Sequence, residues 1–447
     1  MGPEHRERVS HRAAVRPCGR YCWARWLRPD GLSLGGGSGM TRDLNLEERL
    51  LAILAAPDLP GREKSGGKPG RVYWESFFVA VPFYAAYATL FGFQHNVKKR
   101  LGIQDDSSEA SLAFGFVISL QYIFNLIFRF MHGVVFAPLD SKSRVCVALS
   151  FMILSMLLLA SPIVEEDEGG LRGVILAYAL GGMATGIFEP NFLSCITPLG
   201  SSTKSLAILG IPIGISGLLI GGFFSMGPPL DVPATGVYSF VACFLTVAMG
   251  IMAFAIPGVP IQEGSAHKGL RRLVSDLRQF RAWLPQLWSY AFVFLLDMLV
   301  LSSVSPGVWL YIYDEATVMI RPQVSLATDS FLAIFNTFNM FGSVTGRWLS
   351  YHTSLRHPIV YTIFTGTGVL LMISSRYLQA PLLQCLATYF VMLGDGLIYG
   401  SVSRHIDENI PKEFNLTGIS YWCVNGDIGA IIGTNSISTL RSYMIGN

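Results

Sequence analysis

Residues 181–200 read GGMATGIFEPNFLSCITPLG, an apolar run of membrane-spanning length that contains one acidic residue, Glu189. A charged side chain at the centre of a membrane helix costs about 2.5–3.5 kcal/mol on insertion scales. It therefore needs a partner or a polar cavity. Glycines precede Glu189 and Pro190 follows it, so the stretch predicts a helix break at which a carboxylate and freed backbone groups can bind a solute.

The whole chain has a membrane composition. Of its 447 residues, 51% are hydrophobic and only 14% are charged, against about 25% charged residues in soluble proteins. The mean hydropathy is +0.45. These values argue against a soluble enzyme, a disordered protein and a nucleic-acid binder. The net charge is only +3, so the bulk charge indicates no nucleic acid or other polyanionic partner.

From residue 72 onward, apolar runs near 20 residues recur, the length that crosses a bilayer core of about 30 Å. Strands of a membrane β-barrel would alternate and be about 10 residues long, so we predict an all-α polytopic membrane protein. The eleven predicted spans are residues 73–93, 112–137, 144–163, 171–193, 204–227, 237–256, 285–311, 330–349, 358–375, 381–402 and 418–440.

Four segments are expected. Residues 1–72 carry 13 basic and 8 acidic residues and are predicted to be a cytosolic, mostly disordered tail with one short amphipathic helix at 45–55. Residues 262–284 form a basic amphipathic loop that we expect along the cytosolic membrane surface. The loop separates an N-terminal six-helix bundle, 73–261, from a C-terminal five-helix bundle, 285–447. This is a six-plus-five, major-facilitator-like arrangement.

The distribution of basic residues predicts the orientation. With the N-terminus inside, the inner loops hold 12 Lys and Arg residues and the outer segments hold 7. The positive-inside rule then places the N-terminus in the cytosol and the C-terminus outside or in a lumen. The sequence does not indicate which cellular membrane houses the chain. The seven scattered cysteines are expected to be reduced and packed.

Five charged residues lie well within predicted spans: Arg129, Glu189, Asp297, Asp395 and Asp427. Glu189 is a substrate-binding candidate, and the alternative is a buried ion pair with Arg129. Asp297 either lines the pathway, where it would be a candidate proton-coupling site, or is a paired residue within its bundle. Asp395 and Asp427 adjoin glycines, which favours a role in helix-helix contact.

The span at 330–349 contains a second polar group. Asn336 and Asn339 are three residues apart and share one helical face, so they form either a hydrogen-bonding wall for a solute or an interhelical contact. Arg347 ends the run FNTFNMFGSVTGRW. No GxxxxGK[ST] motif, HExxH motif or His/Cys ligand set is present. We therefore expect no ATP drive, no metal, no cofactor and no enzymatic activity.

These features together resemble the equilibrative nucleoside transporter family of solute carriers, over residues 73–443. That family has eleven spans, a cytosolic N-terminus and a long loop between helices 6 and 7. Phe338-Asn339 and Gly346-Arg347 are similar to its FNxxDxxGR signature, with one additional residue between them. Ser343 stands where the family has an Asp that helps hold the ribose. Glu189 lies near the family's substrate-contacting Gln and would add a titratable group.

The resemblance implies a solute transporter with alternating access of two bundles around a midplane site. The expected substrate is a nucleoside or nucleobase, moved by facilitated or proton-coupled transport. Expected pathway residues are Glu189, Arg129, Asn339, Ser343 and Arg347, with Asp297 as the proton site. One alternative is a divergent major facilitator superfamily transporter of another small solute such as an amino acid or a sugar. It is suggested by the stretch HGVVFAPLDSKSR at 132–144. Another is a multi-pass membrane protein that does not transport.

Overall fold

The computed structural model describes most of the chain beyond residue 70. The described residues are 71–103, 109–162, 169–226, 230–258, 274–275, 277–304, 317–321, 324–353, 358–378 and 380–445. Nearly all of the predicted tail at 1–72, its short helix at 45–55 and most of the predicted loop at 262–284 lie outside these residues.

The described residues are almost entirely helical. In chain order the elements are α2 (Glu75–Gly92), α3 (Gln94–Arg100), α4 (Glu109–Val135), α5 (Ser141–Ala160), α6 (Gly169–Ile196), η2 (Thr197–Leu199), α7 (Ser201–Met226), α8 (Ala234–Phe254), α10 (Phe280–Val304), β1 (Thr317–Arg321), β2 (Val324–Ala327), α12 (Thr328–His352), η3 (Pro358–Tyr361), α13 (Thr362–Tyr377), α14 (Pro381–Asn409), η4 (Lys412–Phe414) and α15 (Asn415–Ile445). Each predicted span coincides with one long helix, so the all-α polytopic class is confirmed.

Eight of the described helices are long and apolar enough to cross a membrane by length and composition. The helices α2, α12 and α15 are outside that set. In α12 and α15, Ser, Thr, Asn and Gly replace many aliphatic residues, which lowers their mean hydropathy although they pack among the other helices. The protein is an integral multi-pass membrane protein, and eleven crossings stay a prediction.

Several helix ends differ from the predicted ones. The helix α14 continues to Asn409, two turns beyond the predicted end at residue 402, because its polar last turns still pack on neighbouring helices. The helix α10 begins at Phe280 and not at Pro285, which lies inside the helix beyond its first turn. Residues 305–311 of that predicted span lie outside the described residues.

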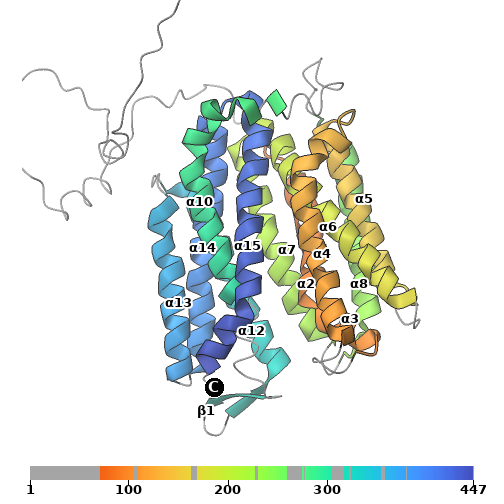
Figure 1. Cartoon of the computed structure of the whole chain (residues 1–447), viewed down its shortest axis with the longest axis vertical. Coiled ribbons are helices and arrows are strands. Elements are labelled where there is room, and N and C mark those ends of the chain that lie inside the picture. The colour runs from red at the N-terminus through yellow and green to blue at the C-terminus, as the bar shows by residue number, and fades with distance from the viewer. Residues whose placement is uncertain are drawn as a thin grey trace, which may run out of the picture. The chain divides into compact units, whose positions relative to one another are not determined.

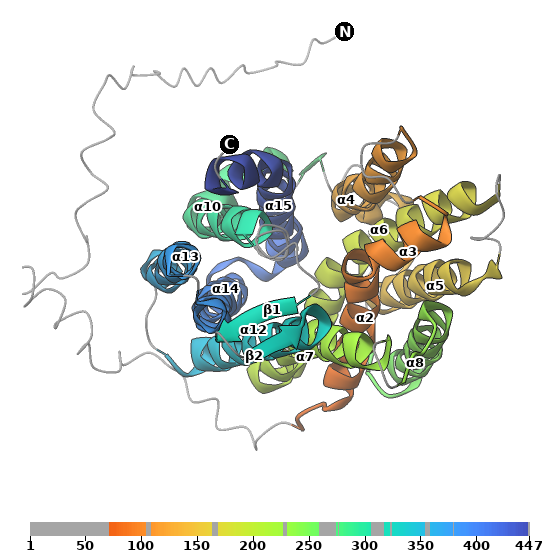
Figure 2. The same cartoon turned by 90° about the horizontal axis from the view of Figure 1, so that it is seen from below.

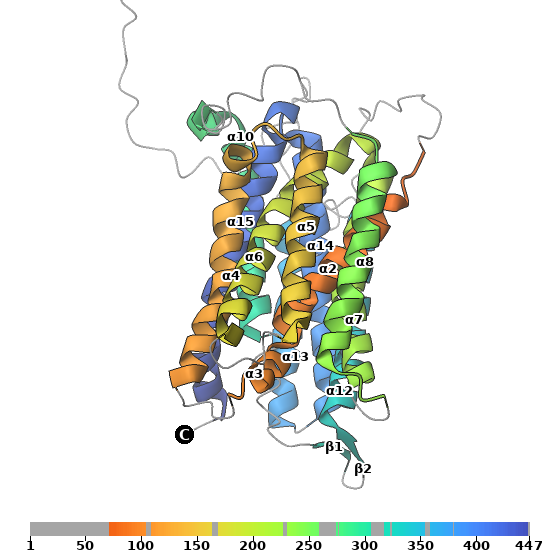
Figure 3. The same cartoon turned by 90° about the vertical axis from the view of Figure 1, so that its right-hand side faces the viewer.

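A short β-hairpin lies between two helices where the sequence predicts only a loop. Strands β1 and β2 pair antiparallel, with Val318 opposite Leu326 and an irregularity between Met319 and Arg321. The segment TVMIR is rich in the β-branched residues that favour strands, but it is too short to stand out. The hairpin lies at the same end of the helices as the last turns of α15 (Figure 1 and Figure 3).

The helices pack in two groups, which Figure 2 shows side by side. In the first helix group (α2 to α8), the main neighbours are α2 with α7, α5 with α6 and α8, and α4 with α6. In the second helix group (α10 to α15), they are α12 with α14, α10 with α15, and α13 with α14. The groups meet where α7 contacts α12 and where α15 contacts α4 and α6.

Glycines permit the closest of these contacts. A Cβ on Gly186 of α6 would overlap the backbone carbonyl oxygen of Asn125 on α4. Likewise, a Cβ on Gly346 of α12 would overlap the carbonyl oxygen of Leu393 on α14. Small residues at helix interfaces let backbones approach closely in membranes, where van der Waals packing drives association. Gly186, together with Gly182 one turn earlier, therefore permits the short distance between α4 and α6.

The predicted helix break beside Glu189 is wrong. The helix α6 runs without interruption from Gly169 to Ile196, with Pro190 inside it. Proline removes one backbone donor, but neighbouring helices and side chains can satisfy freed backbone groups in a membrane. The carbonyl that Pro190 leaves without its helical donor is that of Gly186, four residues earlier, and the helix nevertheless continues to Ile196. Glu189 therefore projects from a continuous helix.

We predict that Gly186→Ala destabilises the protein by about 1–3 kcal/mol, the usual cost of overpacking. The added methyl group must push α4 away from α6. Gly217→Ala is the matched control, because that glycine also lies within a helix but a Cβ there meets no atom within 4 Å. Thermal melting of the detergent-purified proteins measures the difference. Equal melting temperatures of the two variants would contradict this packing role.

Candidate functional site

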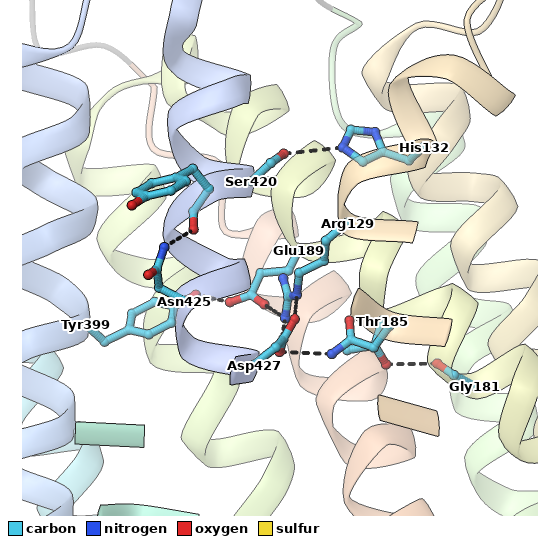
Figure 4. Close-up of polar contacts among 11 residues, drawn as sticks. Arg129, His132, Gly181, Thr185, Glu189, Tyr399, Ser420, Asn425 and Asp427 are labelled. Atoms are coloured by element: carbon cyan, nitrogen blue, oxygen red, sulfur yellow. Dashed lines mark hydrogen bonds and ion pairs between the residues drawn. The ribbon is translucent and has the colours of Figure 1, made fainter. Parts of the chain in front are cut away.

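Three charged side chains meet where the two helix groups touch. Arg129 comes from α4, Glu189 from α6 and Asp427 from α15, and all three are buried. Arg129 Nη2 lies 2.7 Å from Glu189 Oε2, and Arg129 Nε donates to Asp427 Oδ2. Figure 4 shows the guanidinium between the two carboxylates. We call these three residues the central charge cluster.

Neutral side chains from both helix groups complete this cluster. The hydroxyl of Tyr399 on α14 donates to Glu189 Oε1 at 2.6 Å. The amide of Asn125 on α4 donates to Asp427 Oδ1 at 3.0 Å. Glu189 therefore has partners in both helix groups, and Arg129 and Asn125, which bind Asp427, belong to the group opposite its own. If the two helix groups move relative to each other where they meet at the central charge cluster, these contacts must break or be exchanged for others.

A chain of hydrogen bonds lies about one turn from Arg129 along α4. Asn191 Nδ2 lies 3.1 Å from His132 Nδ1, and His132 Nε2 lies 3.4 Å from Ser420 Oγ on α15, as Figure 4 shows for the second contact. Since the amide of Asn191 is a donor, His132 Nδ1 accepts. The other ring nitrogen then carries the hydrogen and donates to Ser420, which makes His132 neutral.

Arg347 anchors a second polar group. Its Nη2 lies 3.5 Å from Asp395 Oδ2 on α14, and its Nη1 donates to the carbonyl of Ile208 on α7 at 3.2 Å. The guanidinium carbon lies 4.4 Å from the centroid of the Tyr399 ring, a cation-π distance. Arg347 thus contacts the first helix group directly, and Tyr399 lies between it and Glu189.

Asp297 belongs to this second polar group and not to the central charge cluster. Its Oδ1 accepts from Thr365 Oγ1 of α13 at 3.0 Å, and its carboxyl group also interacts with that of Asp395. The charged residues that act on it are Asp395 and Arg347. Two carboxylates therefore share the neighbourhood of one guanidinium, as they also do around Arg129.

The other residues singled out on α12 have different environments. Ser343 is fully buried, its side chain acts on the carboxyl group of Asp395, and its backbone carbonyl faces Gly396. Asn336 donates to the carbonyl of Leu332 within its own helix at 2.9 Å. Asn339 is half-buried. The structure thus gives no shared hydrogen-bonding wall of Asn336 and Asn339 among the contacts it describes.

A second ion pair, which the sequence does not indicate, joins the two helix groups. Lys204 at the start of α7 is 1% exposed, and its Nζ lies 2.7 and 2.8 Å from the carboxylate oxygens of Asp407 on α14. Thr197 and Asn415 also donate to Asp407. The two residues are 203 positions apart in the chain, so no local sequence pattern indicates that they pair.

Some members of the site have a signal in the sequence. Gln121, Asn125 and Arg129 recur every fourth residue along α4, the spacing of one helical face, and a polar row in an apolar helix marks a buried interface. The glycine beside Asp427 indicates close packing, but nothing in the sequence indicates its bond to Arg129. Among the described residues, no group of three or more His, Cys, Asp or Glu side chains is arranged to hold a metal ion.

We predict that Arg129→Met destabilises the protein by about 3–5 kcal/mol, the usual cost of leaving buried charge without its partner. Both Glu189 and Asp427 lose their cation in this variant. Adding Glu189→Gln and Asp427→Asn should recover much of the stability, since no uncompensated charge then remains. Arg281→Met, at an exposed position, is the control. A single Arg129→Met variant that melts like the control in detergent would refute the stabilising role of the cluster.

No family model and no curated protein matches this chain. Solved structures do match. The major facilitator superfamily proton:xylose symporter XylE bound to 6-bromo-6-deoxy-D-glucose has a TM-score of 0.60 and 13% identity, covering 84% of this chain and 88% of that chain. The E. coli fucose:proton symporter FucP has a TM-score of 0.56 and 16% identity, with coverage of 84% and 94%.

A partially occluded, inward-open structure of the E. coli xylose transporter XylE also matches, with a TM-score of 0.58, 13% identity and coverage of 81% and 90%. At these identities the likeness shows the fold alone. The chain therefore has a major-facilitator-like fold, and the central charge cluster lies where its two helix groups meet.

Proposed function

We propose that this chain is a secondary transporter that moves a small polar solute across a membrane by alternating access. The observation that carries the proposal is the central charge cluster, in which Arg129, Glu189 and Asp427 are buried between two helix groups. Buried ionisable residues in membrane proteins are expensive and mark solute or proton pathways. Rocking of one group against the other around such a site is the mechanism expected for this class of fold.

The contacts of the cluster support a binding role beyond structural pairing. Arg129 Nη1 is buried and has no hydrogen-bond partner. A guanidinium has five N–H donors, and a donor left unpaired in a membrane interior costs free energy. A solute hydroxyl, carbonyl or ring nitrogen would satisfy it. Glu189 would accept from the solute or hold a proton, exchanging its bond to Tyr399 as the groups move.

Nucleosides and nucleobases are the first substrate class that we propose. Ser343 replaces the acidic residue of the nucleoside transporter signature, but Asp395 on the adjacent helix brings a carboxylate to Arg347. A carboxylate therefore still lies beside Arg347, the arginine that matches the signature. Arg347 would fix α12 or contact the solute, and Asn339 on the same helix would contribute an amide. Sugars are the second candidate, because the matching structures are described as sugar:proton symporters.

Charge balance in the second polar group supports proton coupling. Two carboxyl groups lie in the neighbourhood of Arg347: Asp395 on α14, which pairs with it, and Asp297 on α10. One guanidinium cannot neutralise two carboxylates, and a net charge in a low-dielectric interior is costly. One carboxyl group of the two would therefore hold a proton. Asp297 is the proposed site, because Asp395 and not Asp297 pairs with Arg347 and the two carboxyl groups interact with each other.

The proposed orientation keeps the N-terminus in the cytosol and the C-terminus outside or in a lumen. In the proposed domain division, the N-terminal bundle at 73–261 moves against the C-terminal bundle at 285–447.

The test of function is uptake into liposomes that contain the purified full chain. Radiolabelled adenosine, uridine, D-xylose, L-fucose and an amino-acid mixture are supplied with and without a pH gradient. Movement of none of these solutes would favour a membrane protein that does not transport.

We predict that Glu189→Gln lowers uptake on the order of tenfold or more, because a hydrogen bond to a charged group contributes about 1.5–3 kcal/mol. Initial uptake rates in the same liposomes measure the effect. Glu75→Gln is the matched control, since Glu75 pairs with Arg71 at the start of α2, away from the cluster. Unchanged uptake and unchanged pH dependence in Glu189→Gln would remove Glu189 from the mechanism.

We predict that Asp297→Asn abolishes the stimulation of uptake by an inwardly directed proton gradient, while uptake down the solute gradient persists. The amide cannot bind the coupled proton, but it can still accept from Thr365. Asp231→Asn serves as control, because Asp231 is exposed and has a positive φ of 46°, which Asn tolerates. Stimulation that survives in Asp297→Asn would place the proton elsewhere.

A further inference from the structure

The two carboxylates of the central charge cluster are not equivalent, because they belong to different helix groups. Glu189 on α6 is in the same group as Arg129 on α4. Gly182 and Gly186 let these two helices approach each other backbone to backbone. Glu189 therefore stays beside Arg129 when one helix group moves against the other.

Asp427 moves with the second helix group. On the same helix, a Cβ on Gly429 would overlap the backbone carbonyl oxygen of Leu295, so α15 is packed closely on α10. The side chains that donate to Asp427 in the described contacts, Arg129 and Asn125, both lie on α4 of the first group. If the two groups separate at the central charge cluster, Asp427 loses these donors together.

The charges of the cluster do not balance while the groups are in contact. One guanidinium lies between two carboxylates, and a net charge in a low-dielectric interior is costly. Among the described residues, the other ionisable side chains that interact with Asp427 are Tyr87, Tyr122 and Cys423. Their ordinary pKa values keep them uncharged at neutral pH. The cluster therefore requires one more positive charge.

His132 on α4 cannot supply that charge. Asn191 Nδ2 lies 2.6 Å from the carbonyl oxygen of Ile187 and 3.1 Å from His132 Nδ1. A carbonyl oxygen only accepts, so the atom that contacts both must be the amide nitrogen, and His132 Nδ1 accepts from it. Asn191 and His132 belong to the same helix group, which keeps the imidazole neutral wherever the groups stand. Lys204 is already paired with Asp407.

We infer that Asp427 is a proton-exchange residue at the interface of the two helix groups. While the groups are in contact, the central charge cluster holds one proton for its two carboxyl groups. When they separate, Glu189 keeps Arg129 as its counter-ion, so the proton leaves with Asp427. The Asp427 carboxyl group then gives this proton to water on the side that has opened and becomes a carboxylate. Before the groups close again, Asp427 takes up a proton from that side. This inference rests on the proposed transport function and names a further residue of the same site.

The proton on Asp427 has a different effect from the one proposed on Asp297. The side chains that act on Asp297 all belong to its own helix group and stay with it: Thr365, Asp395 and Arg347. Asp427 carries its proton in both directions of the cycle, with or without solute, so it adds no driving force. It adds a dependence on pH even when the pH is equal on both sides. Uptake should fall as this pH rises, because the groups close only after Asp427 has bound a proton.

Infrared spectroscopy tests whether the cluster holds the proton. The C=O stretch of a protonated carboxyl group is separate from the carboxylate bands, and the purified full chain is measured without solute in H₂O and D₂O. We expect this band to be weaker by one carboxyl group in Asp427→Asn than in wild type. The control Asp231→Asn, at an exposed position, should equal wild type. Asp427→Asn should also melt no lower than wild type, because Arg129 keeps Glu189 and no charge loses its partner.

Uptake at equal pH on both sides of the liposome membrane tests the exchange. The background is Asp297→Asn, which lacks the other proposed proton. In this background, raising the pH should slow uptake by up to about tenfold per pH unit, the effect of one proton. The measured quantity is the ratio of the rates at two pH values. Adding Asp427→Asn should bring this ratio to one, whereas adding Asp231→Asn should leave it as it was.

Three outcomes would overturn the inference and leave the transporter proposal standing. The first is an unchanged protonated-carboxyl band in Asp427→Asn. The second is a marked loss of melting temperature in that variant, which would show that Arg129 needs the second carboxylate for stability. The third is a pH dependence of uptake that survives when Asp297→Asn and Asp427→Asn are combined. A wild type that moves no solute would instead remove the proposed function, and the exchange role with it, whatever the infrared result.

Discussion

A guanidinium buried between helices must be matched by carboxylates, and this constraint organises the interface of the two helix groups. Arg129 is matched from two directions, by Glu189 within its own group and by Asp427 from the other. Removing one partner of a buried pair costs more than the pair itself contributes. The helices α4, α6 and α15 are therefore held at the one separation at which all three charges meet, and Gly186 makes that separation possible.

Tyr399 connects the two polar groups. Its hydroxyl donates to Glu189, and its ring faces the guanidinium of Arg347. A continuous line of polar contacts thus runs from Asp395 through Arg347, Tyr399, Glu189 and Arg129 to Asp427. Networks in a low-dielectric interior respond as a unit, since each contact polarises the next. A change at Glu189 therefore acts on both Arg129 and Arg347.

The helices are predictable from the sequence because a bilayer imposes a length of about 20 apolar residues on each span. The five charged residues within spans are equally visible. Their pairing is not, because Arg129 and Asp427 are 298 residues apart. Pro190 predicts a break, but a helix that is surrounded by other helices can continue through a proline, although proline has no backbone N–H to donate. Gln121 and Asn125 precede Arg129 at intervals of four residues and share its helical face. Their uncharged amides do not stand out in the composition as charged residues do.

The Lys204–Asp407 pair has a consequence of its own. Lys204 is almost completely enclosed, and its ammonium group contacts both oxygens of Asp407. An ammonium ion is strongly hydrated in water. Separation of α7 from α14 at that end would therefore require water to enter and surround Lys204 as the ion pair parts. Lys204 therefore becomes hydrated at the same time as that end of the interface opens. The hydration of this one side chain is a direct measure of the opening.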